Sequence, residues 1–456
     1  MKALQRFFEV LKKKSVLTLM AGFSFLTAVS AMAQTAPVAA ATPVTAAPAV
    51  SPISAGDTAW VLVSAALVML MTPGLAFFYG GMVRRKNVLA TIMQSFFLVA
   101  LISVQWVIWG YSVAFGPGND FAGGFSWMML NNIGAINPAA PTIPHYAFMI
   151  FQAMFAVITP ALITGAYAER VSFKGFVVFS LLWAAVVYDP IAHWVWGGGY
   201  FKDALDFAGG TVVHMSSGYS ALTLALLLGT RKNFKKESMV PHNLTLVLLG
   251  AGLLWFGWFG FNAGSALSAN ELACNAFVTT NTAAAMAALI WCLIEFLHHG
   301  KATSLGAASG AVAGLVAITP ACGYVNVGGA LWIGALVSVF CYMAIQIKVQ
   351  MGYDDSLDAF GVHGVGGTWG AIATGIWATK AVNAAGADGW IASGHFTQVL
   401  IQLKTAGATA LYSVVVTVIL YFIVSKTVGF RVDAKSEELG LDLSQHGEEG
   451  YSQNLG

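Results

Sequence analysis

Long apolar stretches alternate with short polar connections along the chain from residue 57 to residue 427. A helix needs about 20 predominantly apolar residues to cross the hydrocarbon core of a bilayer. Eleven stretches reach or approach this length, so the pattern predicts an all-α integral membrane protein with eleven transmembrane helices. These stretches lie at 57–80, 88–115, 145–168, 172–195, 207–229, 242–263, 272–299, 303–320, 327–350, 360–381 and 402–427.

The N-terminal residues follow a different pattern. Three lysines (Lys12–Lys14) precede an apolar run, Val16–Val29, that is short for a membrane span, and Ala31-Met32-Ala33 supplies a small-x-small sequence. This combination predicts a signal peptide at 1–33, and a retained signal anchor is the alternative. Residues 34–56, rich in Ala, Pro, Thr and Val, then form a flexible extracytoplasmic leader.

The distribution of positive charge predicts the orientation. With the mature N-terminus outside, the predicted inner segments hold fourteen Lys and Arg residues and the outer segments hold three. Because positive charge is enriched on the cytoplasmic side of membrane proteins, we expect an N-out/C-in topology in a cell inner membrane. The helical domain then covers 57–428, and 429–456 form a cytoplasmic tail. We interpret the inner charges as topology determinants rather than as binding patches.

Composition agrees with a membrane protein. Hydrophobic residues make up 57% of the 456 residues, charged residues 9%, and mean hydropathy is +0.73. In a typical soluble domain, about a quarter of the residues are charged. A net charge of +2 gives no indication of a nucleic-acid partner. The four cysteines lack CxxC spacing, which argues against a zinc site; a Cys274–Cys322 disulfide is an open alternative that we do not favour.

Two histidines stand out among the apolar helices. His214 and His363 lie in glycine-rich stretches, in the fifth and tenth predicted helices. Each could be an interhelical hydrogen-bond partner, but two in matching settings favour a functional polar seam. Because five is odd, a duplicated five-helix unit would be inverted in the membrane, with a substrate path between the halves. We therefore predict an inverted 5+5 repeat plus an eleventh helix.

The suspected path has a restricted chemistry. It offers imidazoles and aromatic rings and no carboxylate. An unpaired cation in the hydrocarbon region has a high free-energy cost, and this path has no negative charge to offset it. Such a path suits a small solute that is neutral while crossing and that exchanges protons, because imidazole can donate at one nitrogen and accept at the other. Aromatic faces near the entrance would attract a cation before it loses its water.

Six motifs in order carry a resemblance to a known family. The chain resembles the ammonium transporter (Amt/Mep/Rh) family, bacterial Amt branch, over about residues 57–452, and ammonium meets both demands of the path. The motifs are Pro73-Gly74-Leu75-Ala76-Phe77-Phe78-Tyr79-Gly80-Gly81, Ala168-Glu169-Arg170, Asp206-Phe207-Ala208-Gly209-Gly210-Thr211-Val212-Val213-His214, Trp258-Phe259-Gly260-Phe261-Asn262-Ala263-Gly264-Ser265, Ile318-Thr319-Pro320-Ala321-Cys322-Gly323-Tyr324 and Asp358-Ala359-Phe360-Gly361-Val362-His363-Gly364.

The resemblance implies a homotrimer in membrane lipid, with a separate ammonium pore through each subunit and no cofactor. Ammonium is recruited outside, loses a proton near a phenylalanine gate and crosses as ammonia past the twin histidines. Without the motifs, the aromatic residues of this path would be read as core or interfacial-belt residues. The implied residues are Phe155, Trp196 and Ser265 for recruitment, Phe155 and Phe261 with nearby Phe151 for the gate, and His214, His363 and Trp258 for the lumen.

Two aspartates need separate interpretation. The family places Asp206 beside the recruitment site, but its position before the fifth helix favours an N-cap. The spacing from Trp196 to Asp206 is two residues shorter than in well-known bacterial members. Asp189, in Tyr188-Asp189-Pro190, has no clear family counterpart; backbone groups freed by the proline would satisfy it, or it contributes to the pore.

The C-terminal stretch 440–451 resembles the family's cytoplasmic tail, which PII-type signal proteins engage; a solvated acidic tail is the alternative. Rival functions are an ammonium sensor with little flux, which methylammonium uptake would distinguish, and gas conduction of the Rh type. A membrane enzyme ranks last because the sequence has no catalytic triad, metal cluster or phosphate-binding loop.

Overall fold

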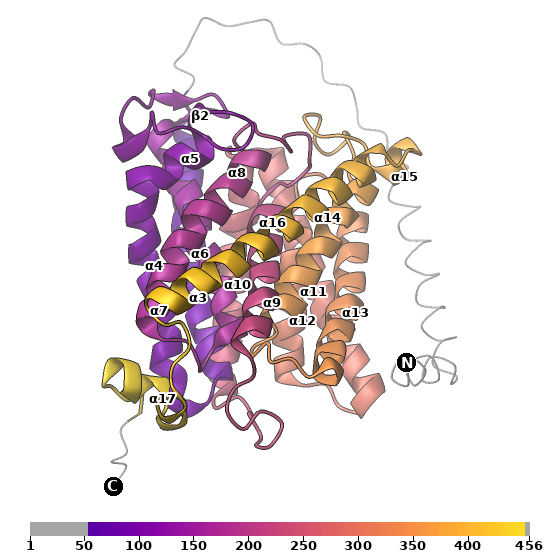
Figure 1. The fold of residues 1–456 in the computed structure, drawn as a ribbon. Coiled ribbons are helices and arrows are strands. Elements are labelled where there is room, and N and C mark those ends of the chain that lie inside the picture. The colour runs from indigo at the N-terminus through magenta and orange to yellow at the C-terminus, as the bar shows by residue number, and fades with distance from the viewer. Residues whose placement is uncertain (1–52, 452–456) are drawn as a thin grey trace, which may run out of the picture. The chain divides into compact units, whose positions relative to one another are not determined.

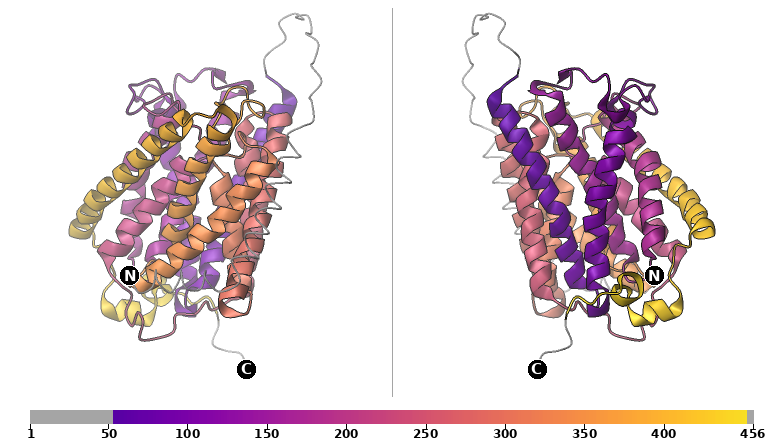
Figure 2. Two further views of the ribbon diagram at one scale, coloured as in Figure 1. Left: turned by 90° about the vertical axis from the view of Figure 1, so that its right-hand side faces the viewer. Right: turned by 90° about the vertical axis from the view of Figure 1, so that its left-hand side faces the viewer.

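The computed structural model describes residues 53–451. The predicted signal peptide (1–33) and the leader as far as residue 52 lie outside the described residues, so both stay predictions. Within the described part, the helices form a bundle in which most run side by side (Figures 1 and 2). The long helix α16 (Thr397–Thr427) crosses the bundle obliquely and packs on α7, α9 and α14 (Figure 1).

Each of the eleven predicted ranges contains a helical segment. Nine segments of the described chain are long and apolar enough to cross a membrane; α12 is shorter, and the segment formed by η7 and α14 falls outside this set. The chain is therefore a multi-pass helical membrane protein, and the number eleven stays a prediction. The segments are α3 (Ala55–Met82), α4 (Val88–Gln105) with η2 (Trp106–Gly110) and α5 (Tyr111–Phe115), α6 (His145–Tyr167), α7 (Phe173–Trp183) with η4 (Ala184–Tyr188) and α8 (Asp189–Val195), η5 (Gly210–Met215) with α9 (Ser216–Leu228), α10 (Leu244–Ala263), α11 (Glu271–His299), α12 (Ser304–Ile318), α13 (Val327–Met351), η7 (Phe360–Gly364) with α14 (Val365–Trp377), and α16.

Four of these segments each contain a π-helical turn, namely η2, η4, η5 and η7. A π-turn widens the helix locally and occurs frequently at functional sites. Two of the four turns, η5 and η7, hold His214 and His363. Hydropathy cannot predict such turns, because they change backbone hydrogen bonding without changing the apolar pattern.

The segments that carry the two histidines approach each other at glycines. A Cβ atom at Gly218 in α9 would overlap the backbone nitrogen of Gly364 in η7. Small residues at a crossing let two backbones come together without side chains between them. This crossing brings the fifth and tenth segments into direct contact.

Short elements lie outside the main segments. The strands β1 (Ile136–Asn137) and β2 (Ala140–Pro144) form an antiparallel pair, a small departure from the all-α prediction. Both lie in the polar connection before α6, where no long apolar run exists to form a helix. The other short elements are η1 (Arg85–Asn87), η3 (Met128–Leu130), η6 (Gly264–Ala266), α15 (Trp390–Ser393), α17 (Ala434–Leu439) and η8 (Asp442–His446).

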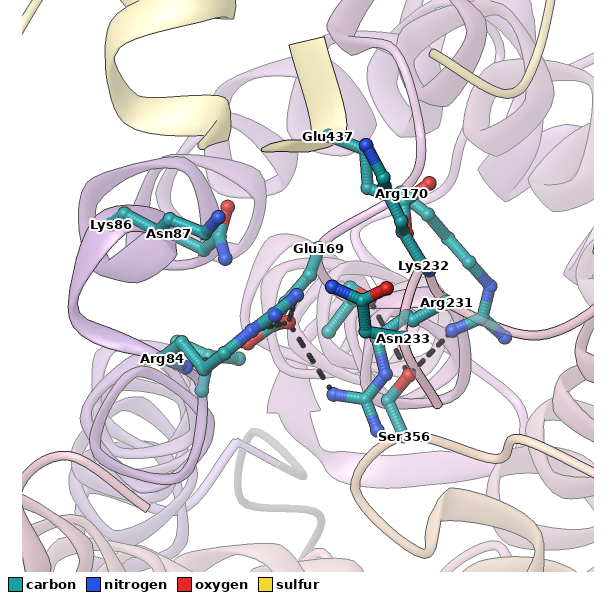
Figure 3. A network of polar contacts seen from close by, with 12 residues as sticks. Arg84, Lys86, Asn87, Glu169, Arg170, Arg231, Lys232, Asn233, Ser356 and Glu437 are labelled. Atoms are coloured by element: carbon teal, nitrogen blue, oxygen red, sulfur yellow. Dashed lines mark hydrogen bonds and ion pairs between the residues drawn. The ribbon is translucent and has the colours of Figure 1, made fainter. Parts of the chain in front are cut away.

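A network of charged side chains connects several loops of the protein (Figure 3). The buried Glu169 carboxylate accepts hydrogen bonds from Arg84 N and Nε (2.6 and 2.7 Å) and lies 3.5 Å from Arg231 Nη1. Arg231 also donates to Asp354 at 2.8–2.9 Å. Burial alone would raise the pKa of Asp354, but hydrogen bonds and charges from Arg231 and Arg170 hold it below its ordinary value. The charged residues of this network therefore connect loops to one another, in addition to any role in setting the membrane orientation.

The tail that follows α16 contacts the same loops. Glu437 in α17 accepts hydrogen bonds from the backbone nitrogen of Lys232 and from Arg431 Nη2, the latter at 2.8 Å. Asp442 in η8 accepts from two backbone N–H groups in the first turn of α4, at 3.1 and 2.8 Å. As far as residue 451, the tail is thus an ordered part of the bundle and not only a solvated acidic segment.

Candidate functional site: a buried histidine pair and a row of aromatic rings

Two buried histidines face each other between the fifth and tenth segments. Nδ1 of His214 lies 3.3 Å from Nδ1 of His363, and the two ring planes differ by 18°. A hydrogen bond between these atoms needs one donor and one acceptor, so one Nδ1 carries a hydrogen and the other presents a lone pair. The geometry therefore provides two coupled imidazoles that can exchange a proton.

Asp206 fixes the start of the His214 segment. Its two carboxylate oxygens accept hydrogen bonds from four consecutive backbone N–H groups, residues 209–212, at 2.6–3.1 Å. Gly209 has a φ of +111°, in the region that favours glycine. Asp206 thus has the geometry of an N-cap, and both of its oxygens are occupied by backbone donors.

Asp355 has the same relation to the His363 segment and is not among the residues predicted from the sequence. It accepts hydrogen bonds from the backbone nitrogens of Ala359 and Phe360 at 3.1 and 2.9 Å. Burial raises the pKa of Asp355 to about 6, although the positive charge of Lys348 acts in the opposite direction. Both capping aspartates precede their histidine by eight residues, and this repeated spacing is the signal that could have identified Asp355.

A narrow cavity lies against the histidine pair. Its volume is about 10 Å³, which is room for about one water-sized molecule. His214 and His363 line it together with aliphatic and aromatic side chains, among them Leu162, Trp258 and Phe261. Within the described protein, His214 Nε2 has no hydrogen-bond partner. A molecule in this cavity would therefore meet an apolar wall that is interrupted by imidazole nitrogens.

Trp258 supports the His214 ring. The two rings are stacked, with centroids 5.4 Å apart and planes 24° apart. Trp258 Nε1 donates to Thr319 Oγ1 at 2.9 Å, and this hydroxyl in turn donates to Leu315 O at 2.7 Å. The indole N–H is thus satisfied outside the cavity, which leaves the apolar ring on the cavity side. Thr319 belongs to one of the six motifs, but its role as a support for Trp258 was not predicted.

The predicted gate and recruitment aromatics form a row that leads to the pair. Phe155 and Phe261 have centroids 4.3 Å apart, and Phe151 packs edge-on to Phe155 at 5.0 Å. Trp196 meets Phe155 edge-on at 5.9 Å, and Phe261 lies 6.0 Å from the His214 ring. The structure therefore brings together aromatic rings that are distant in sequence. They come from α6, the C-terminal end of α8, α10 and η5.

Polar groups next to this row have defined partners. Ser265 Oγ donates to Phe261 O at 2.8 Å, so its oxygen lone pairs remain available to a donor. Trp196 Nε1 donates to the backbone oxygen of Asp206 at 2.8 Å. This bond links the aromatic row to the cap of the His214 segment. Ser265 and Trp196 are both partly exposed, whereas Phe155 and Phe261 are buried.

Asp189 and two of the cysteines lie outside this row, and the structure shows their surroundings. Asp189 accepts a hydrogen bond from Gln105 Nε2 at 2.7 Å. Its carboxylate does not line the cavity, and its partner is a side chain rather than backbone groups freed by the proline. Cys274 and Cys322 are free thiols, the first exposed and the second buried.

Comparison with known proteins decides the family. A sequence model of the Ammonium Transporter Family matches residues 59–451. The chain belongs to this family. The ammonium transporter of Bacillus subtilis is 51% identical over 405 residues, which cover 88% of this chain and 99% of that protein. Ammonium transporter Amt1 of Archaeoglobus fulgidus is 47% identical over 405 residues, with 88% and 100% covered. The resemblance to the bacterial Amt branch is confirmed.

Solved structures of ammonium transporter family members share the fold. Saccharomyces cerevisiae Mep2 has a TM-score of 0.82 and 37% identity, covering 89% of this chain and 93% of that one. A chain described as a sensor Amt protein has a TM-score of 0.79 and 28% identity, covering 86% and 98%. The curated relatives are named transporters, which supports a transport function rather than an enzymatic one.

Proposed function

We propose that this ammonium transporter family member recruits NH4+ at its aromatic vestibule, removes a proton and conducts NH3 through the cavity beside His214 and His363. One observation carries the proposal above the others. The two imidazoles are in hydrogen-bond distance, 3.3 Å, at a cavity that admits about one small molecule. A path this narrow and apolar requires a substrate that can give up its charge and recover it.

Recruitment uses the outer end of the aromatic row. An ammonium ion within about 6 Å of a Trp or Phe face gains roughly 0.5–2 kcal/mol, and Trp196 and Phe155 lie together there. Ser265 supplies an oxygen that accepts an ammonium N–H, because its own hydrogen is donated to Phe261 O. The buried rings of Phe155 and Phe261 form the gate beneath the vestibule, and Phe151 supports it.

The proton must leave before the lumen. An isolated ion in an apolar interior costs far more than a neutral polar molecule, which loses only its hydrogen bonds with water. In the lumen, ammonia can donate to or accept from imidazole nitrogen, and Trp258 keeps His214 in position by stacking. The proton is relayed through the Nδ1–Nδ1 contact. Net transport is electrogenic if the proton continues inward and electroneutral if it returns outside.

The arrangement of segments supports an inverted 5+5 repeat with an eleventh helix, α16. Neighbour relations of the first five segments recur in the next five: α3 packs on α4 and α6, and α10 packs on α11 and α12. In addition, α6 packs on α9 as α12 packs on α14. The eight-residue spacing from capping aspartate to histidine occurs once in each set. The substrate path then lies between the halves.

Topology and assembly complete the proposal. We infer an N-out/C-in protein of a cell inner membrane, with the loop network of Figure 3 on the cytoplasmic face. The chain would act as a homotrimer in membrane lipid, each subunit with its own pore. The docked tail, held by Glu437 and Asp442, offers an ordered surface for a PII-type signal protein.

The decisive experiment measures flux into liposomes under an ammonium gradient. His214→Ala and His363→Ala should each reduce ammonium flux or reduce selectivity over potassium, because each removes one half of the relay. His395→Ala, a change at an exposed histidine, is the matched control and should behave as the parent protein. Unchanged flux and unchanged selectivity in both pore variants would overturn the relay.

Two further measurements separate the remaining alternatives. Solid-supported membrane currents distinguish the transport modes, since an electroneutral protein gives no ammonium-dependent current. The likeness to a sensor Amt protein makes a sensor with little flux the second candidate. Methylammonium uptake in a strain without its own ammonium transporters should be restored by this chain, and absence of uptake with normal expression would favour the sensor.

A further inference from the structure

A buried carboxyl and a buried amide form a pair between the second and fourth segments. Asp189 begins α8 directly after the π-turn η4, and Gln105 ends α4 directly before the π-turn η2. Gln105 Nε2 donates to Asp189 Oδ2 at 2.7 Å. Asp189 and Gln105 are 0% and 1% exposed, and neither lines the histidine cavity.

Each partner has one oxygen that this hydrogen bond leaves unused. Asp189 Oδ1 and Gln105 Oε1 are both buried without a hydrogen-bond partner in the described protein. A buried polar atom without a hydrogen-bond partner destabilises the folded protein, so two such atoms on a pair of residues already joined by a hydrogen bond need a physical explanation. They are the remaining polar atoms of two planar groups, a carboxyl and an amide, that already share one hydrogen bond.

An ionised Asp189 would be poorly compensated. None of the ion pairs formed within residues 53–451 includes Asp189. The residue lies in a membrane-spanning segment, where an unpaired charge is expensive. One amide N–H is a small compensation for a full negative charge, and buried acids in this situation neutralise by binding a proton.

We propose that Asp189 is a proton-binding site whose carboxyl is neutral and donates from Oδ1 to Gln105 Oε1. The pair then has two hydrogen bonds, one in each direction, like the dimer of a carboxylic acid with a primary amide. A single proton, taken from solvent when the protein assembles, satisfies both unused oxygens and removes the buried charge. The inference does not depend on the proposed transport mechanism.

The backbone around Gln105 supports a built pair. Gly110 lies one π-turn further along the same segment, and a Cβ atom there would lie 2.7 Å from Gln105 Nε2 and 2.8 Å from Oε1. The side-chain amide therefore rests against Gly110, in the position where its Nε2 donates to the carboxyl. Any larger residue at position 110 would displace the amide from Asp189.

The pair is part of a wider link between the two segments. His193, one turn beyond Asp189 in α8, is in hydrogen-bond distance of Ala114 O in α5 at 3.0 Å. The acid–amide pair and this contact hold the outer part of the second segment to that of the fourth. A neutral pair does so without placing a fixed negative charge in the membrane, where it would bind cations.

Infrared difference spectra of the full chain in lipid at neutral pH test the protonation directly. The parent-minus-Asp189→Asn spectrum should contain the C=O stretching band of a protonated carboxylic acid, shifted downward in D2O. Asp120→Asn, a matched change at an exposed aspartate, should remove carboxylate bands instead. Loss of carboxylate bands in Asp189→Asn would overturn the proposal and indicate an ionised acid, for example one bridged to Gln105 by a water molecule.

Thermal unfolding provides a second, independent readout. Asparagine can replace a protonated aspartate in the pair, because its NH2 group donates to Gln105 Oε1 while its oxygen accepts from Nε2. Asp189→Asn should therefore unfold at the parent's temperature, and Asp189→Ala, which leaves the amide alone, at a lower one. Equal losses in both variants would contradict the proposed exchange of hydrogen bonds.

Discussion

Replacement of Asp206 by asparagine tests how much of the site depends on backbone capping. The carboxylate accepts four N–H groups through two oxygens. Asparagine keeps one oxygen, which can accept two of them, and turns an NH2 group toward the other two. Two buried donors then lack partners at about 1–3 kcal/mol each, so we expect a loss of about 2–6 kcal/mol in the free energy of unfolding.

Asp355 gives an internal scale for this estimate. It accepts one N–H group on each oxygen, so asparagine leaves one donor unpaired and should cost about half as much, about 1–3 kcal/mol. Asp120→Asn, at an exposed side chain, should cost nothing measurable. The three variants should therefore rank Asp206, Asp355, Asp120 in order of lost stability.

The assay combines chemical or thermal unfolding of the purified protein with ammonium flux in liposomes. Loss of the cap displaces η5, so Asp206→Asn should lose transport because His214 is no longer opposite His363. If Asp206→Asn keeps the parent's stability but needs more ammonium for half-maximal flux, the carboxylate acts as a ligand of the cation, and the capping argument is refuted.

Three other expectations follow from named contacts. Gly218→Ala should destabilise the protein by about 1–3 kcal/mol or more and abolish flux, because the added methyl group meets the Gly364 backbone. Gly407→Ala, at a glycine with open space around it, is the control and should be tolerated. Equal effects of the two substitutions would contradict the close crossing. Trp258→Phe removes the donor to Thr319 and should cost about 1 kcal/mol in unfolding measurements; no loss would show that the bond is not needed. The pKa of Asp355 is raised from 3.8 to about 6. The protonated carboxyl therefore stabilises the folded protein fully below pH 4, and about 3 kcal/mol of this stability is lost as pH rises through about 6. Unfolding measurements between pH 4 and 7 should show this fall in the parent protein and not in Asp355→Asn.

The helical segments could be predicted from sequence because membrane spans are selected for length and apolarity, which are local properties. Prediction was weaker where other forces decide the boundary. The apolar pattern starts the fifth segment at residue 207, but η5 begins at Gly210, where the Asp206 carboxylate caps the backbone N–H groups of residues 209–212. The eleventh was expected from residue 402, and α16 begins at Thr397.

The candidate site was only partly accessible from sequence. His214 and His363 were singled out because polar residues are rare in apolar segments, yet their contact depends on the Gly218 crossing, which is a tertiary feature. The pairing of Asp189 with Gln105, 84 positions apart, could not be read from either local sequence. Likewise, the support that Thr319 gives to Trp258 joins two motifs that had no visible connection.

The small volume beside the histidines has a practical consequence for studies of this protein. A radiolabelled methylammonium tracer is longer than the natural substrate by a methyl group, whereas the cavity has about 10 Å³, room for about one water-sized molecule. If the substrate crosses this cavity, as proposed, the tracer passes only when lining side chains such as Trp258 and Phe261 move aside. On the proposed path, the rate of tracer uptake would therefore understate the rate at which the protein conducts ammonium.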